Sequence, residues 1–282
     1  MPAKKSNRPS PGKSLAIGRS AEISEYGQDK ILKLFFKEFP ASEVDTEYSN
    51  SVIAFSSNAT SMKCYEKVKV GDRHGLIFDR LDGISLTKLP DKNPLALFSL
   101  SKILADLHLD LHNKKTKKMN DIRAEAVKVL SREPLSFLNK EEKKVAKRLI
   151  ENLPEGSSIL HLDFHPENVV VTKDSFVIID WMTALKGDPA ADVASTVFLF
   201  QDAELWPGTP FLKVLFYTVV RKFILKGYLK RYLSVSGMDW KNIEKWRLPI
   251  LVFRLGLWNI ESERSALQKE IREIISSSKA GK

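Results

Sequence analysis

Cysteine is nearly absent from this sequence, and long apolar runs are missing altogether. The single Cys64 permits no disulfide within the chain, which is typical of a protein of the reducing cytosol. No apolar run approaches the roughly 20 residues that span a bilayer, so the sequence predicts no membrane partner. The first residues also lack the apolar segment of a secretory signal. We therefore expect a cytoplasmic protein.

The sequence also lacks an internal repeat and any RNA-binding or helix-turn-helix signature. Its formal charge of +10 nevertheless makes nucleic acid or an anionic surface a rival partner. The basic residues are scattered, and the cluster at 226–233, KGYLKRYL, is simply explained as the solvated face of a helix. The sequence thus does not favour nucleic acid. With 282 residues, 43% of them hydrophobic, the chain can bury one large core or two lobes.

One stretch, HLDFHPENVVVTKDSFVIIDW at 161–181, constrains the chemistry. Asp163 lies five positions before Asn168, the interval between the catalytic Asp and the metal-binding Asn of the protein-kinase loop H-R-D-x-x-x-x-N. We predict that Asp163 accepts the proton of an attacking hydroxyl. His161 belongs to the same predicted catalytic loop, more as a support for its structure than as a proton carrier. His165 fits a packed histidine and a substrate contact equally well.

Two short apolar segments lie between Asn168 and Asp180, parted by residues 173–175, and they predict a hairpin with a three-residue loop. If Thr172 faces Phe176, then Asn168 faces Asp180. Directly opposite residues of an antiparallel pair have Cα atoms only about 5 Å apart. Mg²⁺ takes few protein oxygens and completes its shell with waters and substrate phosphates. We therefore predict Asn168 and Asp180 as Mg²⁺ ligands.

HLDFHPENVVV followed by VIIDWMTALKGDPAADVA resembles the loop and metal-binding segment of the aminoglycoside phosphotransferase and choline kinase-like enzymes. These are small-molecule kinases of the protein-kinase-like fold. The resemblance implies an α+β, two-lobed protein-kinase-like fold with a small antiparallel-sheet N-lobe and a larger, mostly helical C-lobe. Leu162 and Phe164 leave no H-R-D arginine, and Trp181 stands where protein kinases carry Phe-Gly. Both departures favour the small-molecule branch.

The resemblance extends to a nucleotide-binding half. KILKLFF at 30–36 is similar to the family strand whose lysine reaches the α and β phosphates, which implies this role for Lys33. Residues 42–55 are predicted to form a helix, and the resemblance implies that Glu47 on it forms the salt bridge to this lysine; Glu43, one turn earlier on the same face, is the alternative. In the same family the GDPAADVA stretch opens a helix, so Asp188 and Asp192 are implied to be scaffold.

The glycine-rich turn of the family is shortened in this chain. AIGRSAEISEYG offers Gly18 and Ser20 in a turn whose backbone N–H groups can still cradle phosphate. GLIFDRLDGISL at 75–86 resembles the interlobe hinge, which implies that adenine binds backbone groups near Asp79 and Leu81. The nucleotide site predicted from the resemblance thus uses main-chain groups at both ends.

Further helices are predicted after the hinge, including one from residue 211 that ends at Gly237. Residues 94–113 carry a leucine stripe at helical spacing, with His108 and His112 one turn apart on it. Such a pair can bind zinc, but no H-E-x-x-H glutamate lies between them and zinc is not favoured. We expect a disordered basic tail at 1–13, an N-terminal nucleotide-binding lobe and hinge at 14–84, and a C-terminal catalytic and substrate lobe at 85–282.

The predicted function is an ATP-dependent phosphotransferase that uses Mg²⁺ and moves the γ-phosphoryl group to a hydroxyl of a small molecule. An aminoglycoside-like compound, an amino alcohol or a sugar would be the acceptor, although a basic chain disfavours a polycationic one. A non-catalytic nucleotide-binding pseudokinase or scaffold is the first alternative, motivated by the shortened turn. A protein kinase-like enzyme is the second, disfavoured because no A-P-E segment follows Asp180.

Overall fold

The computed structural model describes residues 11–93, 95–203 and 210–280. The protein divides into two compact units. The first comprises Met1–Leu86 and Glu167–Thr183, and the second comprises Thr87–Pro166 and Ala184–Lys282.

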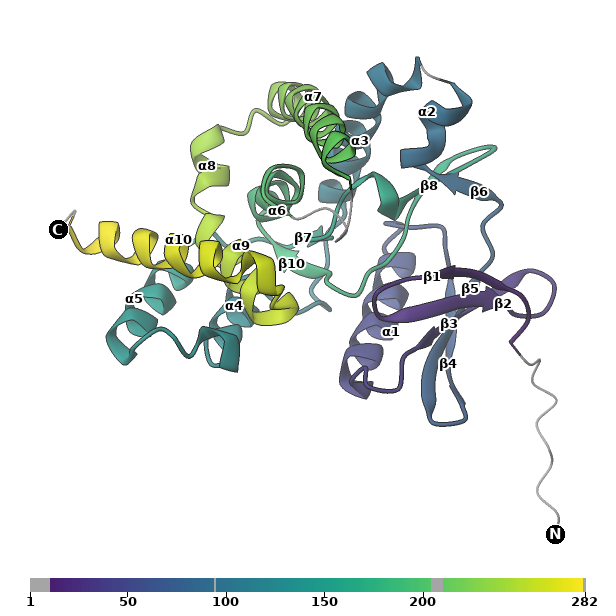
Figure 1. Ribbon diagram of the computed structural model, residues 1–282, viewed down its shortest axis with the longest axis horizontal. Helices are drawn as coiled ribbons and strands as arrows, with labels where there is room; N and C mark the ends of the chain where they lie inside the picture. Colours follow the sequence, from purple (N-terminus) through teal and green to yellow (C-terminus); the bar gives the residue numbers. More distant parts are fainter. Residues whose placement is uncertain (1–10, 94, 204–209, 281–282) are drawn as a thin grey trace, which may run out of the picture. The chain divides into compact units, whose positions relative to one another are not determined.

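The first unit is built on a five-stranded antiparallel sheet with the strand order β1-β2-β3-β5-β4 (Figure 1). Helix α1, Ala41–Ser56, packs against β4 and β5 and confirms the helix expected at 42–55. The strands are β1 Ser14–Ile17, β2 Ala21–Glu25, β3 Lys30–Phe35, β4 Cys64–Val70 and β5 Arg73–Asp79.

The side chains of β3 alternate between the two faces of this sheet, as they must in an extended strand. Phe35 lies in a core cluster with Val44 of α1 and with Leu76 of β5. Leu32 and Leu34 lie in a separate cluster. Because Lys33 is two residues from Phe35, it belongs to the face that α1 covers.

The segment Glu167–Thr183 belongs to the first unit because its hairpin adds to β6. Strands β6 (Gly83–Ser85), β8 (Val169–Thr172) and β9 (Phe176–Ile178) form a three-stranded sheet in the order β6-β8-β9. A Cβ on Gly83 would lie 2.5 Å from the Val171 carbonyl oxygen, so glycine allows this close pairing. The lobe boundary expected after residue 84 stays a prediction, but the chain returns to the first unit at Glu167–Thr183.

Backbone hydrogen bonds of the first unit already involve the end of the expected tail, just before β1. Residues 1–10 of that tail lie outside the described residues. Gly12 N donates to Glu25 O at 2.8 Å, and Glu25 N donates to Lys13 O at 3.0 Å. Backbone pairing therefore reaches two residues into the segment that was expected to be disordered.

The second unit is mostly helical, as expected (Figure 1). Its small antiparallel sheet pairs β7 (Ser158–Leu160) with β10 (Leu185–Gly187). The helices are α2 Leu89–Lys92, α3 Ala96–Asn113, α4 Ile122–Val129, α5 Lys140–Glu151, α6 Pro189–Gln201, α7 Phe211–Ser236, α8 Trp240–Glu244, α9 Arg247–Phe253 and α10 Glu261–Ala280.

Sequence signals at the helix ends of this unit act through local hydrogen bonds. Asn139 and Glu142 form a reciprocal capping box at the start of α5. Asp188 Oδ1 accepts from Ala190 N at 2.8 Å, and Pro189 occupies the first turn of α6. An Asp directly before a proline is typical of such a helix start. Gly237 ends α7 with a φ of 69°, a left-handed conformation that glycine adopts without strain.

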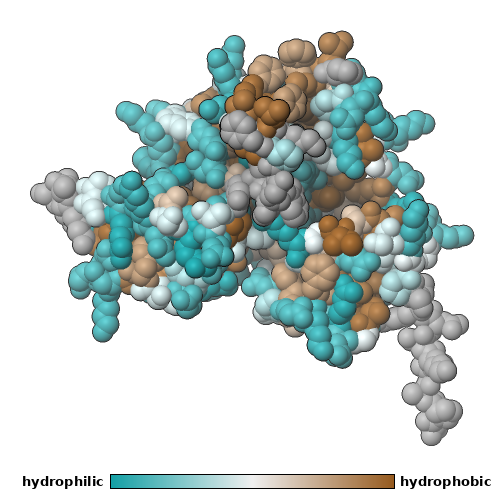
Figure 2. Space-filling model, in the orientation of Figure 1, coloured by the Kyte–Doolittle hydropathy of each residue, from teal (hydrophilic) through white to brown (hydrophobic). Residues whose placement is uncertain are grey.

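Helix α7 packs along α3 at very short range. A Cβ on Gly227 would lie 2.6 Å from Ser101 Oγ, so the two backbones approach where glycine faces serine. Ser101 Oγ donates to Ile224 O at 3.0 Å and ties the helices together. The amino-terminal half of α7 differs, because its apolar side chains are exposed there, and Figure 2 shows brown surface over this helix.

Among the described residues, no helix combines the length and the apolar character needed to cross a bilayer.

Candidate functional site

Lys33 is the buried cation of the first unit. Its Nζ atom lies 2.6 Å from Glu47 Oε1 and 3.1 Å from Asp180 Oδ1. The Lys33 and Glu47 side chains are 12% and 1% exposed. The alternation of β3 and the helical face of α1 thus bring together two residues that the family resemblance paired, whereas Glu43 is not in this contact.

The charges of this group depend on one another. Burial by itself would lower the pKa of Lys33, but the carboxylates of Asp180 and Glu47 raise it above its ordinary value. Burial raises the pKa of Glu47 to about 7, although the Lys33 ammonium opposes the shift. Lys33 therefore stays protonated at neutral pH, and Glu47 can be ionised there only because the lysine is beside it.

Asp180 lies where the backbone leaves β9 and turns sharply. Its φ is 65°, a left-handed conformation that is uncommon for a residue with a side chain. Thr60 Oγ1 donates to Ile178 O at 2.7 Å, and Asn50 Nδ2 donates to Trp181 O at 3.1 Å. Hydrogen bonds on both sides of Asp180 therefore hold this conformation, which leaves its side chain 37% exposed.

The hairpin register predicted from the sequence is wrong by one residue. Val171, not Thr172, faces Phe176, and Ile179 N donates to Asn168 O at 3.0 Å. Thr172 instead bonds across the turn, since its N donates to Ser175 O at 2.9 Å and its Oγ1 accepts from Ser175 N at 3.0 Å. These bonds close a two-residue turn, so Asn168 faces Ile179 and not Asp180.

Asn168 and Asp180 both belong to the first unit, and each can offer a side-chain oxygen to a metal ion. Asn168 ends a short 3₁₀ helix, Pro166–Asn168, and is 8% exposed. One amide oxygen and one partly exposed carboxylate are hard ligands, the set that Mg²⁺ binds together with waters and phosphates. The residues present therefore fit a magnesium ion, and their role as ligands stays a prediction.

The turn that was predicted to cover phosphate is short in the structure. Gly18 N donates to Ala21 O at 2.8 Å, which leaves Arg19 and Ser20 as a two-residue turn between β1 and β2. Ser20 O accepts from Phe36 N at 2.9 Å. The Gly18 N–H is thus already used within the sheet, and any phosphate contact would fall to the turn itself.

The segment that was predicted to bind adenine begins at the end of β5. Asp79 Oδ2 accepts from Lys63 N at 2.8 Å, and Asp79 Oδ1 accepts from Tyr65 Oη at 2.7 Å. The Asp79 side chain is therefore engaged with the neighbouring strand, and a contact to adenine would use the main chain. Leu81, which is partly buried, follows in the unpaired segment before β6.

The predicted catalytic loop follows β7 in the second unit. Leu162 has a left-handed φ of 63° and precedes Asp163, whose side chain is 26% exposed. His165 Nε2 lies 3.6 Å from Asp163 Oδ1. His161 is fully buried, which suits a support of the loop.

Helix α6 holds the backbone of this loop. Asp192 accepts from His161 N at 2.5 Å and from Leu162 N at 2.7 Å. Ser195 Oγ donates to Leu162 O at 2.6 Å, and Thr196 Oγ1 donates to Phe164 O at 3.2 Å. The expectation that Asp192 is scaffold thus has a specific basis: it binds the two N–H groups just before Asp163.

Sequence reasoning did not find every member of this group. Ser195 and Thr196 were missed because hydroxyls within a helix are common and carry no signal of their own. Tyr228 and Tyr232, which bond to His108 and His112, were assigned to the solvated face of a helix. Their spacing of four residues, equal to that of the two histidines, was the only available sign.

Comparisons with known proteins agree with this architecture. The model of the phosphotransferase enzyme family (APH) matches residues 66–216. A thermostable mutant of aminoglycoside phosphotransferase APH(4)-Ia, in its apo form, is 16% identical over 98% of this chain and 97% of its own, with a TM-score of 0.64. A putative fructosamine-3-kinase from Haemophilus somnus 129PT is 16% identical over 93% of this chain and 90% of its own, with a TM-score of 0.59.

A third structure is the amicoumacin kinase hAmiN in complex with AMP-PNP, Ca²⁺ and Ami. It is 14% identical over 94% of this chain and 88% of its own, with a TM-score of 0.54. No curated protein matches the sequence. At such identities the structural likeness shows the fold, and it confirms the expected protein-kinase-like class.

Proposed function

The chain belongs to the phosphotransferase enzyme family, and we propose that it transfers the γ-phosphoryl group of ATP to a hydroxyl group of a small molecule. The observation that carries this proposal is the buried contact of Lys33 with Glu47 and Asp180. A lysine held by two carboxylates is fixed in position and remains charged, as a phosphate-binding cation must.

The nature of the cofactor is supported by a relative of the same fold. The amicoumacin kinase hAmiN was solved with AMP-PNP and Ca²⁺, an ATP analogue and a divalent cation. We infer that this chain takes ATP and that Asn168 and Asp180 hold Mg²⁺. When bound, the cation would neutralise charge on the phosphates during transfer.

The residues of the first unit have separate roles in the proposed reaction. Lys33 binds the α and β phosphates, and Glu47 keeps the lysine in place. The turn at Gly18 and Ser20 covers the phosphates with backbone N–H groups. Main-chain groups near Asp79 and Leu81 bind adenine.

In the second unit, Asp163 accepts the proton of the attacking hydroxyl as that oxygen bonds to phosphorus. The carboxylate is partly exposed, and its backbone is held through Leu162 by α6. Positioning supplies much of the rate in phosphoryl transfer, because the protein takes part in little covalent chemistry. His161 supports the loop.

The acceptor is a small molecule with a hydroxyl group. Amino alcohols, sugars and aminoglycoside-like compounds are the classes to test. They share a hydroxyl nucleophile and differ in charge, so their relative rates of phosphorylation will show which class the site accepts.

The direct test is Mg²⁺-dependent phosphoryl transfer from ATP across such a panel, with wild type, Asp163→Asn and Asp110→Asn. Asp110 is an exposed carboxylate on α3 and serves as the matched control. We expect Asp163→Asn to lower kcat by about 10²-fold to 10⁴-fold with little change in KM, because a general base acts only in the transition state. Equal rates for wild type and Asp163→Asn would remove the base assignment.

The alternatives give other results in the same assay. Tight ATP binding without transfer to any acceptor would favour a pseudokinase. Transfer to a generic protein substrate, and to no small molecule, would favour a protein kinase-like enzyme.

A further inference from the structure

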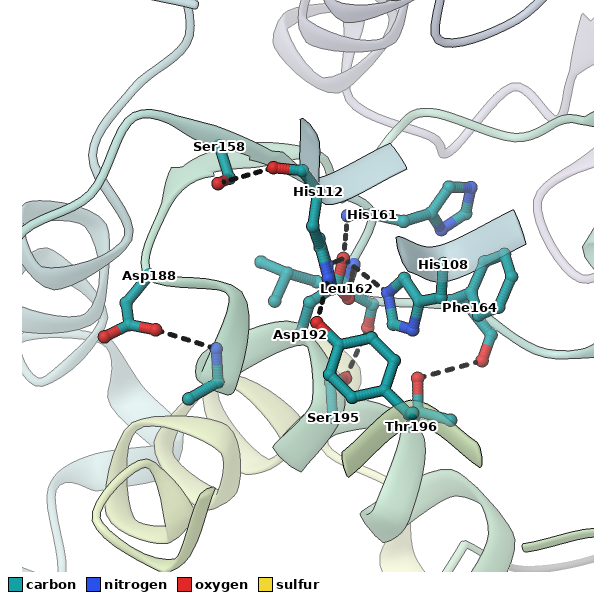
Figure 3. A network of polar contacts seen from close by, with 12 residues as sticks. His108, His112, Ser158, His161, Leu162, Phe164, Asp188, Asp192, Ser195 and Thr196 are labelled. Carbon is teal, nitrogen blue, oxygen red and sulfur yellow. Dashed lines mark hydrogen bonds and ion pairs between the residues drawn. The ribbon is translucent and has the colours of Figure 1, made fainter. Parts of the chain in front are cut away.

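A buried network of polar side chains surrounds Asp192 of α6 (Figure 3). Besides the backbone N–H groups of His161 and Leu162, two imidazoles reach its carboxylate. His112 Nε2 lies 3.2 Å from Asp192 Oδ2. His108 Nε2 lies 3.0 Å from the same oxygen, although its direction departs from that of an ideal hydrogen bond.

The other nitrogen of each imidazole meets a tyrosine of α7. His108 Nδ1 lies 2.7 Å from Tyr228 Oη, and His112 Nδ1 lies 2.6 Å from Tyr232 Oη. In both helices the two residues are four positions apart, so the pairs form two rungs one turn apart between α3 and α7. Gly227, which directly precedes Tyr228, approaches Ser101 of α3 closely and so limits the distance between the two helices.

The chemistry of the groups selects one arrangement of protons. An ionised carboxylate can only accept hydrogen bonds, and a neutral imidazole has one donor and one acceptor nitrogen. If Nε2 of each ring donates to Asp192, then Nδ1 of each ring must accept, and the tyrosine hydroxyls must donate. In that arrangement the donors and acceptors of the two imidazoles, the two hydroxyls and the carboxylate face one another without conflict.

The charges agree with this arrangement. Burial, helped by neighbouring His112, lowers the pKa of His108 to about 4, so the ring is neutral at physiological pH. Burial alone would raise the pKa of Asp192, but the two histidines hold it well below its ordinary value. Burial raises the pKa of Tyr228 and of Tyr232, which keeps both hydroxyl protons in place.

The geometry also argues against a metal at this point. His108, His112 and Asp192 each offer one ligand atom, all within 4.8 Å of one another. Yet both oxygens of Asp192 already accept backbone N–H groups of the catalytic loop. His112 Nε2 lies 3.2 Å from Asp192 Oδ2, which is the separation of a hydrogen bond.

We propose that Tyr228 and Tyr232 are positioning residues of the phosphotransferase: by donating to Nδ1 of His108 and His112, they keep both Nε2–H groups directed at Asp192. Asp192 then holds the N–H groups of His161 and Leu162 and so orients Asp163. The inference rests on the proposed function, in which Asp163 is the base. It adds a connection from α7, through α3 and α6, to the catalytic loop.

Removal of one hydroxyl should change the hydrogen bonds of the network and not only its packing. Phenylalanine fills nearly the same space as tyrosine but cannot donate to Nδ1. Nδ1 is then a buried acceptor without a donor, and the ring is no longer held with its Nε2–H toward the carboxylate. Asp192 loses a donor, and the backbone that it holds becomes less well fixed.

The first arm of the experiment observes the histidines themselves. Full-length protein with ¹⁵N-labelled histidine is studied by long-range ¹H–¹⁵N spectra, with His108→Gln and His112→Gln used for assignment. In wild type we expect the proton of both rings on Nε2 at pH 8, and the His108 ring to stay neutral down to about pH 5. Tyr228→Phe should alter the Nδ1 chemical shift of His108, and Tyr232→Phe that of His112. Tyr217→Phe, an exposed tyrosine of the same helix, should change neither ring.

The second arm measures turnover. The double variant Tyr228→Phe/Tyr232→Phe should lower kcat by about 10-fold or more with KM values within about two-fold of wild type, since positioning acts on the transition state. The single variants provide the same test should the double variant fold poorly.

Nδ1–H rings in wild type, or variants with unchanged spectra and unchanged kcat, would overturn the inference. A wild-type protein that transfers no phosphoryl group would overturn the proposed function and with it the kinetic role of the tyrosines. The spectra would still decide the hydrogen-bond pattern in that case.

Discussion

At the scale of single residues, Lys33 and Glu47 depend on each other for burial. Their side chains are 12% and 1% exposed, and each would be costly to bury as an isolated charge. Asp180 is more exposed, so solvent screens its part of the attraction. The ion pair should therefore behave as a unit when either partner is changed.

Lys33→Met should destabilise the protein by about 3 kcal/mol at pH 8, because it leaves the Glu47 carboxylate buried without its cation. The double variant Lys33→Met/Glu47→Gln should recover most of this loss. Urea denaturation gives the free energies of unfolding. Lys37→Met, which replaces an exposed lysine, should have little effect. Equal losses for the single and the double variant would contradict the pairing.

Much at this scale was accessible from the sequence. The interval between Asp163 and Asn168 and the resemblance around Lys33 brought the candidate residues into view. The tyrosine partners of His108 and His112 did not emerge, because contacts between residues 120 positions apart depend on how α7 packs on α3.

At the scale of elements, local patterns predicted helices better than strand register. The leucine stripe at 94–113 and Gly237 at the end of α7 act through nearby residues, and the helices lie where these signals put them; Pro94 itself is outside the described residues. The hairpin differs because an alternating pattern allows both two-residue and three-residue turns. The Thr172 hydroxyl favours the shorter turn, because it accepts a hydrogen bond from Ser175 N. The left-handed backbone conformation of Asp180 depends on a hydrogen bond from Asn50 of α1 to the next residue.

The contact between α3 and α7 yields a prediction of its own. Gly227→Ala should destabilise the protein by about 1–3 kcal/mol, because the new Cβ would lie 2.6 Å from Ser101 Oγ. In a Ser101→Gly background the same change should cost much less, since the obstructing side chain is absent. Thermal unfolding of the four proteins of this cycle measures the coupling.

Lys226→Ala, at an exposed position of α7, is the control and should be nearly neutral. A Gly227→Ala variant as stable as wild type would show that the helices can move apart freely.

At the scale of the whole molecule, stability should depend on pH through groups that act in opposite directions. His108 has a folded pKa of about 4 against an ordinary value of 6.5, so the unfolded chain binds its proton first as the pH falls. The stability that the neutral His108 ring contributes is fully present above pH 6.5 and is lost as the pH falls from 6.5 to 4. Glu47 is raised from 4.5 to about 7, so its effect on stability worsens as the pH rises through that range.

The variant His108→Gln isolates the contribution of this histidine to the pH dependence of stability. The free energy of unfolding of wild type should fall by on the order of 2 kcal/mol more than that of His108→Gln between pH 7 and pH 4.5. Urea titrations at the two pH values measure it, and the Glu47 term is common to both proteins. Parallel pH profiles would mean that His108 is not held neutral in the folded state.

The proposed function requires a nucleotide site in the first unit that depends on Mg²⁺ and on Asp180. Calorimetric titration of ATP into wild type, Asp180→Asn and the control Asp174→Asn, each with and without Mg²⁺, tests this most directly. Asp174 is an exposed carboxylate in the adjacent turn. We predict that Mg²⁺ strengthens ATP binding to wild type and to Asp174→Asn by about 10-fold or more, and that Asp180→Asn loses this enhancement because one of two protein ligands is gone. Wild type that binds no ATP, or Asp180→Asn that responds to Mg²⁺ as wild type does, would contradict it.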